Sequence, residues 1–160
     1  MPHPDLASLE TLSLAESSHE EWDIVVVGAG VSGSIAAREA ARLGGRVLLV
    51  EKAFLPRRKV CGCFLNANAV ASLKQLALDH LLVTSGAPAV RGVFVSAGRR
   101  RAYLPLPTGA ALSRSWLDAH LAQEARDAGA ALLIRTEAHL VGVDDDMLRV
   151  RLSQGDESVE

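Results

Sequence analysis

Three glycines and one acid have the spacing of a turn that binds a dinucleotide. Gly28, Gly30 and Gly33 follow the apolar run Ile24–Val27 and open a stretch of small residues, and Glu51 ends the next apolar run. In such a G-x-G-x-x-G turn the first glycine permits the bend, the second lets the backbone approach a diphosphate, and the third lets helix and strand pack closely. An acid about 20 residues further on can accept hydrogen bonds from both hydroxyls of a ribose. The spacing therefore predicts a site for a cofactor with a diphosphate and a ribose.

The elements that position these residues alternate between strand and helix. We predict strands buried on both faces at Ile24–Val27, Val47–Val50 and Ala131–Ile134. We predict helices from Val31 or Ser32 to Leu43, over Asn66–Leu78 with Asn66 or Asn68 as its cap, and over Ser115–Ala128. Strands joined by helices imply a parallel sheet, so the predicted fold class is α/β with a Rossmann-like parallel sheet and a βαβ dinucleotide-binding unit. Two antiparallel hairpins are also predicted, at Val93–Leu104 and at Val141–Leu152, the second around an acidic turn at Asp144 to Asp146.

Composition limits the partners and the compartment. The chain has 160 residues, 49% of them hydrophobic and 22% charged, which suits a globular domain with a real core. A net charge of -2 and few aromatic residues give no reason to expect nucleic acid, and no apolar run is long enough to cross a bilayer. Residues 1–21 are predicted to be a flexible polar tail, because the first twenty carry acids but no Lys or Arg, and residues 22–160 are predicted to be the folded domain. We expect a cytoplasmic protein.

Cys61 and Cys63 predict neither a metal site nor a disulfide. A structural zinc site needs four ligands, and the five histidines are dispersed along the chain. A bridge between two cysteines this close would close a strained ring. Asp118 and His120 are predicted to lie on the surface of their helix, so the residues assign no catalytic acid or base, and no metal is expected.

The sequence resembles the flavoprotein superfamily of p-hydroxybenzoate hydroxylase and, more closely, its geranylgeranyl reductase-like branch. The resemblance runs from about Trp22 to Val143 and rests on "DIVVVGAGVSGSIAA", the pair Glu51-Lys52, "PRRKVCG" and "LSRSWLDAHLAQEARDAGA". The combination of the Lys-x-Cys-Gly loop with Ser-Arg-x-x-Leu-Asp is the selective part. Val31 stands where this family usually has proline, a mild departure.

This resemblance implies FAD as the cofactor and a role for each matching residue. The three glycines and Ser32 would hold the diphosphate, and Glu51, followed by Lys52, would hold the adenosine ribose. Cys61 and Gly62 would lie beside the flavin, Arg114 would reach the phosphate or ribitol region, and Ala138 would present backbone to the adenine. Arg114 and Ala138 also have plainer interpretations, as a surface charge and an ordinary strand residue, and Pro56–Lys59 could be only a solvated basic loop. The first hairpin would begin the antiparallel sheet of a substrate domain.

The function expected from the resemblance is that of an FAD-dependent oxidoreductase, either a reductase of isoprenoid double bonds or a flavin monooxygenase. A hydrophobic small molecule would be the substrate, and NAD(P)H a candidate external electron donor. An NAD-dependent dehydrogenase and a non-catalytic nucleotide-binding module stay open as alternatives, and a flavin-dependent halogenase is a related one. The only Gly-Asp pair, Gly155-Asp156, lies in what we predict to be a polar tail, whereas the family has such a pair in a second flavin-contacting segment. We therefore expect these 160 residues to be the N-terminal portion of an enzyme and, alone, to bind FAD weakly or not at all and to show no turnover.

Overall fold

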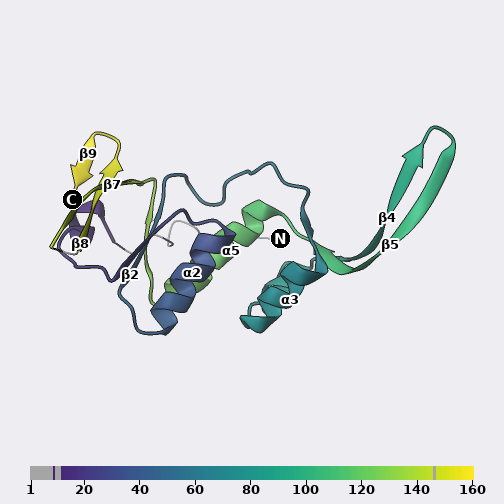
Figure 1. Cartoon of the computed structure of the whole chain (residues 1–160), viewed down its shortest axis with the longest axis horizontal. Helices are drawn as coiled ribbons and strands as arrows, with labels where there is room; N and C mark the ends of the chain where they lie inside the picture. Colours follow the sequence, from purple (N-terminus) through teal and green to yellow (C-terminus); the bar gives the residue numbers. More distant parts are fainter. Residues whose placement is uncertain (1–8, 10–11, 146) are drawn as a thin grey trace. The chain divides into compact units, whose positions relative to one another are not determined.

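The chain divides into two units, and most of their helices and strands are labelled in Figure 1. The structure, a computed structural model, describes Leu9, residues 12–145 and residues 147–160. The parallel-sheet unit comprises the described residues up to Arg57 together with Asp118–Glu160, and the hairpin unit comprises Arg58–Leu117. The hairpin unit is thus an insertion in the sequence of the other, and its second boundary falls inside helix α5 (Arg114–Asp127).

A three-stranded parallel sheet forms the centre of the parallel-sheet unit. Its order is β1 (Ile24–Val27), β2 (Val47–Glu51) and β6 (Ala131–Ile134), and helix α2 (Val31–Arg42) connects β1 to β2. This arrangement confirms the predicted parallel sheet with its βαβ unit. Every residue of β2 is buried, as expected for a strand covered on both faces. The same expectation is wrong for β1, which lies at the edge of the sheet and leaves Ile24 44% and Val27 65% exposed.

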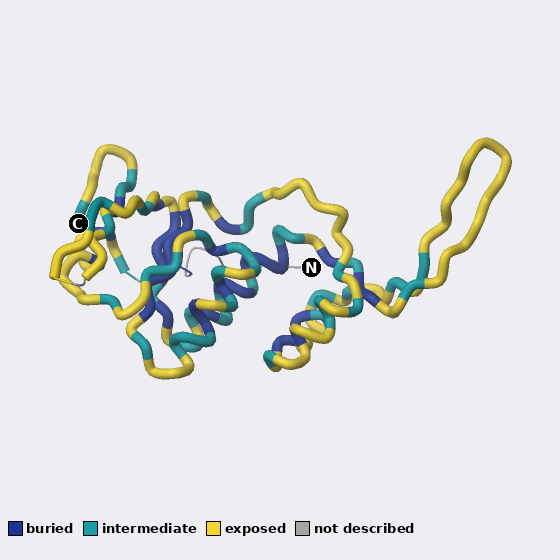
Figure 2. Tube along the Cα trace, viewed as in Figure 1, coloured by how far each residue is buried: buried dark blue, intermediate teal, exposed yellow. Residues whose placement is uncertain are grey.

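The side chains of β2 alternate between two apolar clusters, one on each face of the sheet. Val47 and Leu49 pack with alanines of α2 and α5. Leu48 and Val50 pack instead with Leu14 of helix α1 and with Leu152 of a second, antiparallel sheet. The parallel sheet is therefore the middle of three layers, and β2 and most of β6 are among the dark, buried segments of Figure 2.

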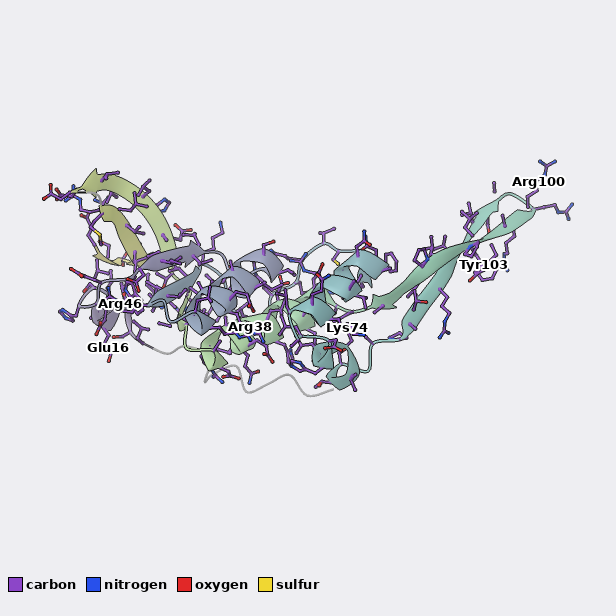
Figure 3. The ribbon with its side chains drawn as sticks, turned by 60° about the horizontal axis from the view of Figure 1, so that its bottom comes forward. Glu16, Arg38, Arg46, Lys74, Arg100 and Tyr103 are labelled. Atoms are coloured by element: carbon purple, nitrogen blue, oxygen red, sulfur yellow. The ribbon has the colours of Figure 1, made fainter. Side chains whose placement is uncertain are left out.

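Helices α2 and α5 contribute buried alanines to the same apolar cluster. Ala37 of α2 and Ala119, Ala122 and Ala125 of α5 are fully buried in one cluster. Arg38, labelled in Figure 3, adds an ion pair from α2 to Glu124 of α5 at 3.7 Å.

Helix α5 is buried over most of its circumference, which corrects one prediction. Asp118 is only 1% exposed, although the sequence pattern suggested a surface position, and His120 is half-buried. An amphipathic pattern is a poor guide on a helix whose neighbours cover more than one side, because polar residues are then enclosed as well.

Residues within the predicted tail form a short helix. Helix α1 (Leu14–Ser17) begins with a reciprocal cap, in which the Glu16 carboxylate accepts hydrogen bonds from the Ser13 backbone N–H at 2.7 Å and hydroxyl at 2.8 Å. Leu9 and Leu14 are buried. The described part of residues 1–21 therefore does not form the flexible polar tail that the sequence predicted, because its leucines are covered by apolar neighbours. Residues 1–8, 10 and 11 lie outside the described part.

The N-terminal ends of β1 and β2 are joined by an exposed ion pair. The Arg46 guanidinium and the Asp23 carboxylate lie 3.1 Å apart, and the Arg46 backbone N–H donates to the same carboxylate at 2.8 Å. These bonds hold the pKa of Asp23 below its ordinary value, with the side-chain bond the larger cause.

A second sheet, β7 (Glu137–Asp144), β8 (Met147–Gln154) and β9 (Glu157–Val159), covers one face of the parallel sheet. The predicted hairpin is therefore present and longer than expected, and it turns at Asp145, with Asp146 outside the described residues. Gly155-Asp156 forms the turn between β8 and β9 instead of lying in a polar tail. The polar composition of this segment had suggested a tail, but the pairing of Leu152 with Val159 joins β9 to β8.

The hairpin unit contains an antiparallel sheet of order β3 (Phe64–Leu65), β5 (Arg100–Ala111) and β4 (Ala89–Ala97), with helices α3 (Ala67–Gln75) and α4 (His80–Thr84). Asn66 caps α3 by accepting the Ala69 N–H at 2.9 Å, which settles the choice between Asn66 and Asn68. Strands β4 and β5 form a long hairpin whose side chains are mostly exposed (Figure 2). Tyr103, labelled in Figure 3, lies over Gly92 on this hairpin, with its ring 5.0 Å from that of Phe94.

None of the helices in the described parts of the chain is both long and apolar enough to span a membrane.

Candidate functional site

The glycine-rich turn connects the carboxyl end of β1 to the start of α2. Gly28 has a φ of +104°, a conformation that L side chains rarely adopt, so the bend requires glycine. A Cβ on Gly33 would lie 2.0 Å from the Gly28 carbonyl oxygen, so the helix can approach the turn only because residue 33 has no side chain. Gly30 is the N-cap residue of α2 with φ −87° and ψ −174°, values that other residues adopt easily.

The start of α2 has the chemistry of an anion site. No side chain caps this helix, since its N-cap residue is Gly30, and Ser32 lies exposed in the first turn. The first backbone N–H groups of a helix have no partner within the helix and carry its positive dipole end. These amides and the Ser32 hydroxyl suit phosphate oxygens.

Glu51 ends β2 and is enclosed by donors from two loops. Its Oε2 accepts the Ala29 N–H at 2.9 Å and the Arg57 Nη2 at 3.1 Å, and its Oε1 accepts the Ala53 N–H at 2.9 Å. The side chain is 2% exposed, so a charge at this depth depends on these donors. The carboxylate therefore ties the glycine-rich turn to the loop that follows β2.

A cavity of about 300 Å³ opens beside this carboxylate, at the carboxyl ends of the strands. Its lining includes Gly28, Glu51, the exposed Lys52 and the half-buried Arg57. It also includes Thr136, just before β7, and Ala138 within β7. Ligands of open α/β sheets bind at this edge. The structure thus brings four of the residues predicted from the sequence, Gly28, Glu51, Lys52 and Ala138, to one cavity.

Gly30, Ser32 and Gly33 lie at the start of α2 in the same unit. Cys61, Gly62 and Arg114 lie in the hairpin unit and are brought together there by strand pairing. Phe64 pairs with Ala111, and the Leu112 N–H donates to the Cys63 carbonyl at 2.8 Å, so the exposed turn containing Cys61 and Gly62 lies beside the start of α5, where Arg114 is the first residue. The Cys63 N–H lies 3.1 Å from the Cys61 Sγ, and both thiols are free.

The cysteines are not accompanied by metal ligands. Across the described residues, His, Cys, Asp and Glu side chains do not gather in groups of three or more that could hold an ion.

A family model for the FAD binding domain matches residues 21–160. The chain belongs to the FAD binding domain family. Within this family it is 39% identical to a menaquinone reductase of Mycobacterium tuberculosis over 146 residues, which are 88% of this chain and 35% of that protein. It is 34% identical to a digeranylgeranylglycerophospholipid reductase 2 of Methanosphaera stadtmanae, over 80% of this chain and 34% of that protein.

The fold of this FAD binding domain is also that of a solved geranylgeranyl bacteriochlorophyll reductase-like protein from Thermoplasma acidophilum. The TM-score is 0.68 and the identity 26%, over 86% of this chain and 36% of the other. These findings confirm the resemblance stated from the sequence. The chain spans about a third of the length of the relatives it matches.

The residues present fit the adenosine diphosphate part of FAD. The start of α2 has no side-chain cap, so its backbone N–H groups can donate to a diphosphate. The cavity beside Glu51 offers polar groups for a ribose. Sequence reasoning missed Arg57, which it left in a basic loop. Its only sequence signal was its place six residues after Glu51, and a cation so near a buried carboxylate was a candidate partner.

Proposed function

We propose that the cavity at Glu51 holds the adenosine ribose of FAD, with the diphosphate at the start of α2. The single observation that carries this proposal is the buried Glu51 carboxylate at the carboxyl end of β2, in a cavity shared with Gly28 and Ala138. Lys52 would face the same cavity, and Cys61, Gly62 and Arg114 of the hairpin unit would serve the flavin end of the cofactor. FAD, when bound, supplies the redox chemistry, while the protein supplies position and electrostatics.

For the whole protein we propose an FAD-dependent oxidoreductase that reduces a hydrophobic molecule with an isoprenoid chain. This proposal is supported by the relatives, a menaquinone reductase and a digeranylgeranylglycerophospholipid reductase, which are 39% and 34% identical to the chain. NAD(P)H is the electron donor to test first. A flavin monooxygenase would consume oxygen in step with the substrate, whereas a reductase would turn over under anaerobic conditions.

The test of the cofactor site is a flavin-fluorescence titration of Glu51→Ala against the unaltered protein, in a longer chain that carries this domain, because these 160 residues alone are expected to bind FAD weakly or not at all. The loss of a charged acceptor should weaken FAD binding by about 1–3 kcal/mol. Glu157→Ala is the matched control, because it removes an equal charge from an exposed position in β9 of the same unit. Equal FAD affinities of Glu51→Ala and the unaltered chain would show that the ribose lies elsewhere.

A further inference from the structure

The hydrogen bonds already made by Glu51 leave it too few acceptor positions for two ribose hydroxyls. A carboxylate offers about four acceptor positions. The Ala29 and Ala53 N–H groups and the Arg57 guanidinium occupy three of them, two on Oε2 and one on Oε1. One position, on Oε1, is left for a ribose hydroxyl, whereas the sequence suggested that Glu51 would accept from both.

Arg57 is a hydrogen-bond donor that lies at the same cavity and already contacts Glu51. Arg57 lines the cavity together with Glu51, and its side chain is 25% exposed. Nη2 donates to Glu51 at 3.1 Å, and Nε is enclosed with no hydrogen-bond partner among the described residues. An arginine has five N–H donors, so one bond to Glu51 leaves it others to give.

We propose that Glu51 and Arg57 bind the adenosine ribose as a pair, in which one hydroxyl donates to Glu51 and the other accepts from Arg57. This inference rests on the proposed function, since it concerns how the same cavity takes the cofactor. The bond from Nη2 keeps the guanidinium aligned beside the carboxylate. Arg57 is thus a cofactor-binding residue, in addition to its structural contact with Glu51.

The experiment follows ADP, 2′-deoxy-ADP and 3′-deoxy-ADP by NMR chemical-shift titration, which measures dissociation constants into the millimolar range. Both deoxy analogues should bind the unaltered chain more weakly than ADP, because each lacks one partner of the pair. In Arg57→Met, ADP should bind on the order of tenfold more weakly, as expected for a lost hydrogen bond to a charged group. One of the two deoxy analogues should then bind this variant as well as ADP does. Arg58→Met is the matched control and should keep the discrimination of the unaltered chain.

The outcomes separate the two proposals. If the unaltered chain does not respond to ADP, the proposed function fails. If ADP binds and Arg57→Met weakens ADP and both analogues by one common factor, Arg57 acts only through Glu51 and the inference is overturned. Unchanged ADP binding in Arg57→Met overturns it as well. If the amide spectrum of Arg57→Met shows an unfolded chain, Arg57→Lys decides: reduced discrimination between ADP and one analogue supports the pair, and unchanged discrimination refutes it.

Discussion

Gly30 and Gly33 belong to one motif, but different constraints act on them. Gly33 is required by the fold, since a Cβ there would meet the Gly28 carbonyl oxygen at 2.0 Å. The backbone angles of Gly30 permit other residues, so we propose that the ligand is the reason for glycine at that position. The two positions therefore separate stability from cofactor binding.

Gly33→Ala should lower the free energy of unfolding by about 1–3 kcal/mol, because the added carbon forces helix α2 away from the turn. Urea denaturation followed by far-UV circular dichroism measures this loss. Gly62→Ala is the matched control, since nothing lies within 4 Å of the Cβ it would add. A Gly33→Ala chain as stable as the control would mean that the turn adjusts at no cost.

In a longer chain that carries this domain, Gly30→Val should abolish FAD binding and keep the helical signal, because the β-branched side chain suits the backbone angles and would fill the space proposed for the diphosphate. Flavin fluorescence and circular dichroism on the same sample report the two properties. Normal quenching of flavin by this variant would return the motif to a purely structural role.

Single residues were predictable where one backbone property decides them. The tight turn at Gly28 and the close packing at Gly33 follow from the motif alone. The contact between Arg57 and Glu51 was not predictable in this way, because it depends on the path of a loop whose residues have no regular spacing.

Among helices and strands, those with an apolar period were predicted and those held by tertiary contacts were missed. Strand β2 was found because burial on both faces gives an uninterrupted apolar run. Helix α1 and strand β9 were missed because they are short and polar, and a side-chain cap and the pairing with β8 stabilise them. The edge position of β1 was also hidden, since an apolar run does not reveal how many neighbours a strand will have.

Asn66→Ala should destabilise helix α3 by about 1 kcal/mol, because the Ala69 N–H loses its acceptor. Hydrogen exchange of the amides in the first turn of α3 measures the effect. Asn68→Ala, at an exposed position inside the helix, is the control and should not increase exchange. Faster exchange in the Asn68 variant than in the Asn66 variant would contradict Asn66 as the cap of α3.

The cap of helix α1 can be tested through the titration of Glu16. The Ser13 backbone N–H, and to a smaller extent its hydroxyl, hold the pKa of Glu16 below its ordinary value. A lowered pKa in the folded state stabilises α1 at pH values above the ordinary pKa, and this contribution is lost as the pH falls through the lowered one. NMR should show the pKa of Glu16 rising a little in Ser13→Ala and further in Ser13→Pro, which also lacks the N–H. An identical titration in all three chains would mean that residues 13–16 form no cap in solution.

At the scale of the whole molecule, the sequence predicted the fold class, its cofactor family and a hairpin that belongs to a substrate domain, but not that this second unit runs from Arg58 to Leu117. The family model covers residues 21–160 without distinguishing them. The division follows from where contacts are made: the two apolar clusters around the parallel sheet draw only on residues outside Arg58–Leu117. Contacts between residues this far apart in the sequence cannot be predicted from the spacing of neighbouring residues.

The hairpin of β4 and β5 also gives the molecule a reporter of its own, because Tyr103 is its single tyrosine. Its hydroxyl donates to the Arg91 carbonyl at 3.1 Å and its ring lies against Phe94, so both contacts are lost when the strands separate. A ring-fluorinated tyrosine would therefore give one fluorine resonance for the hairpin unit. In a urea series this resonance should change before the amides of β2 begin to exchange, since the hairpin is mostly exposed and β2 is wholly buried. Coincident changes would show that the chain melts as one cooperative block.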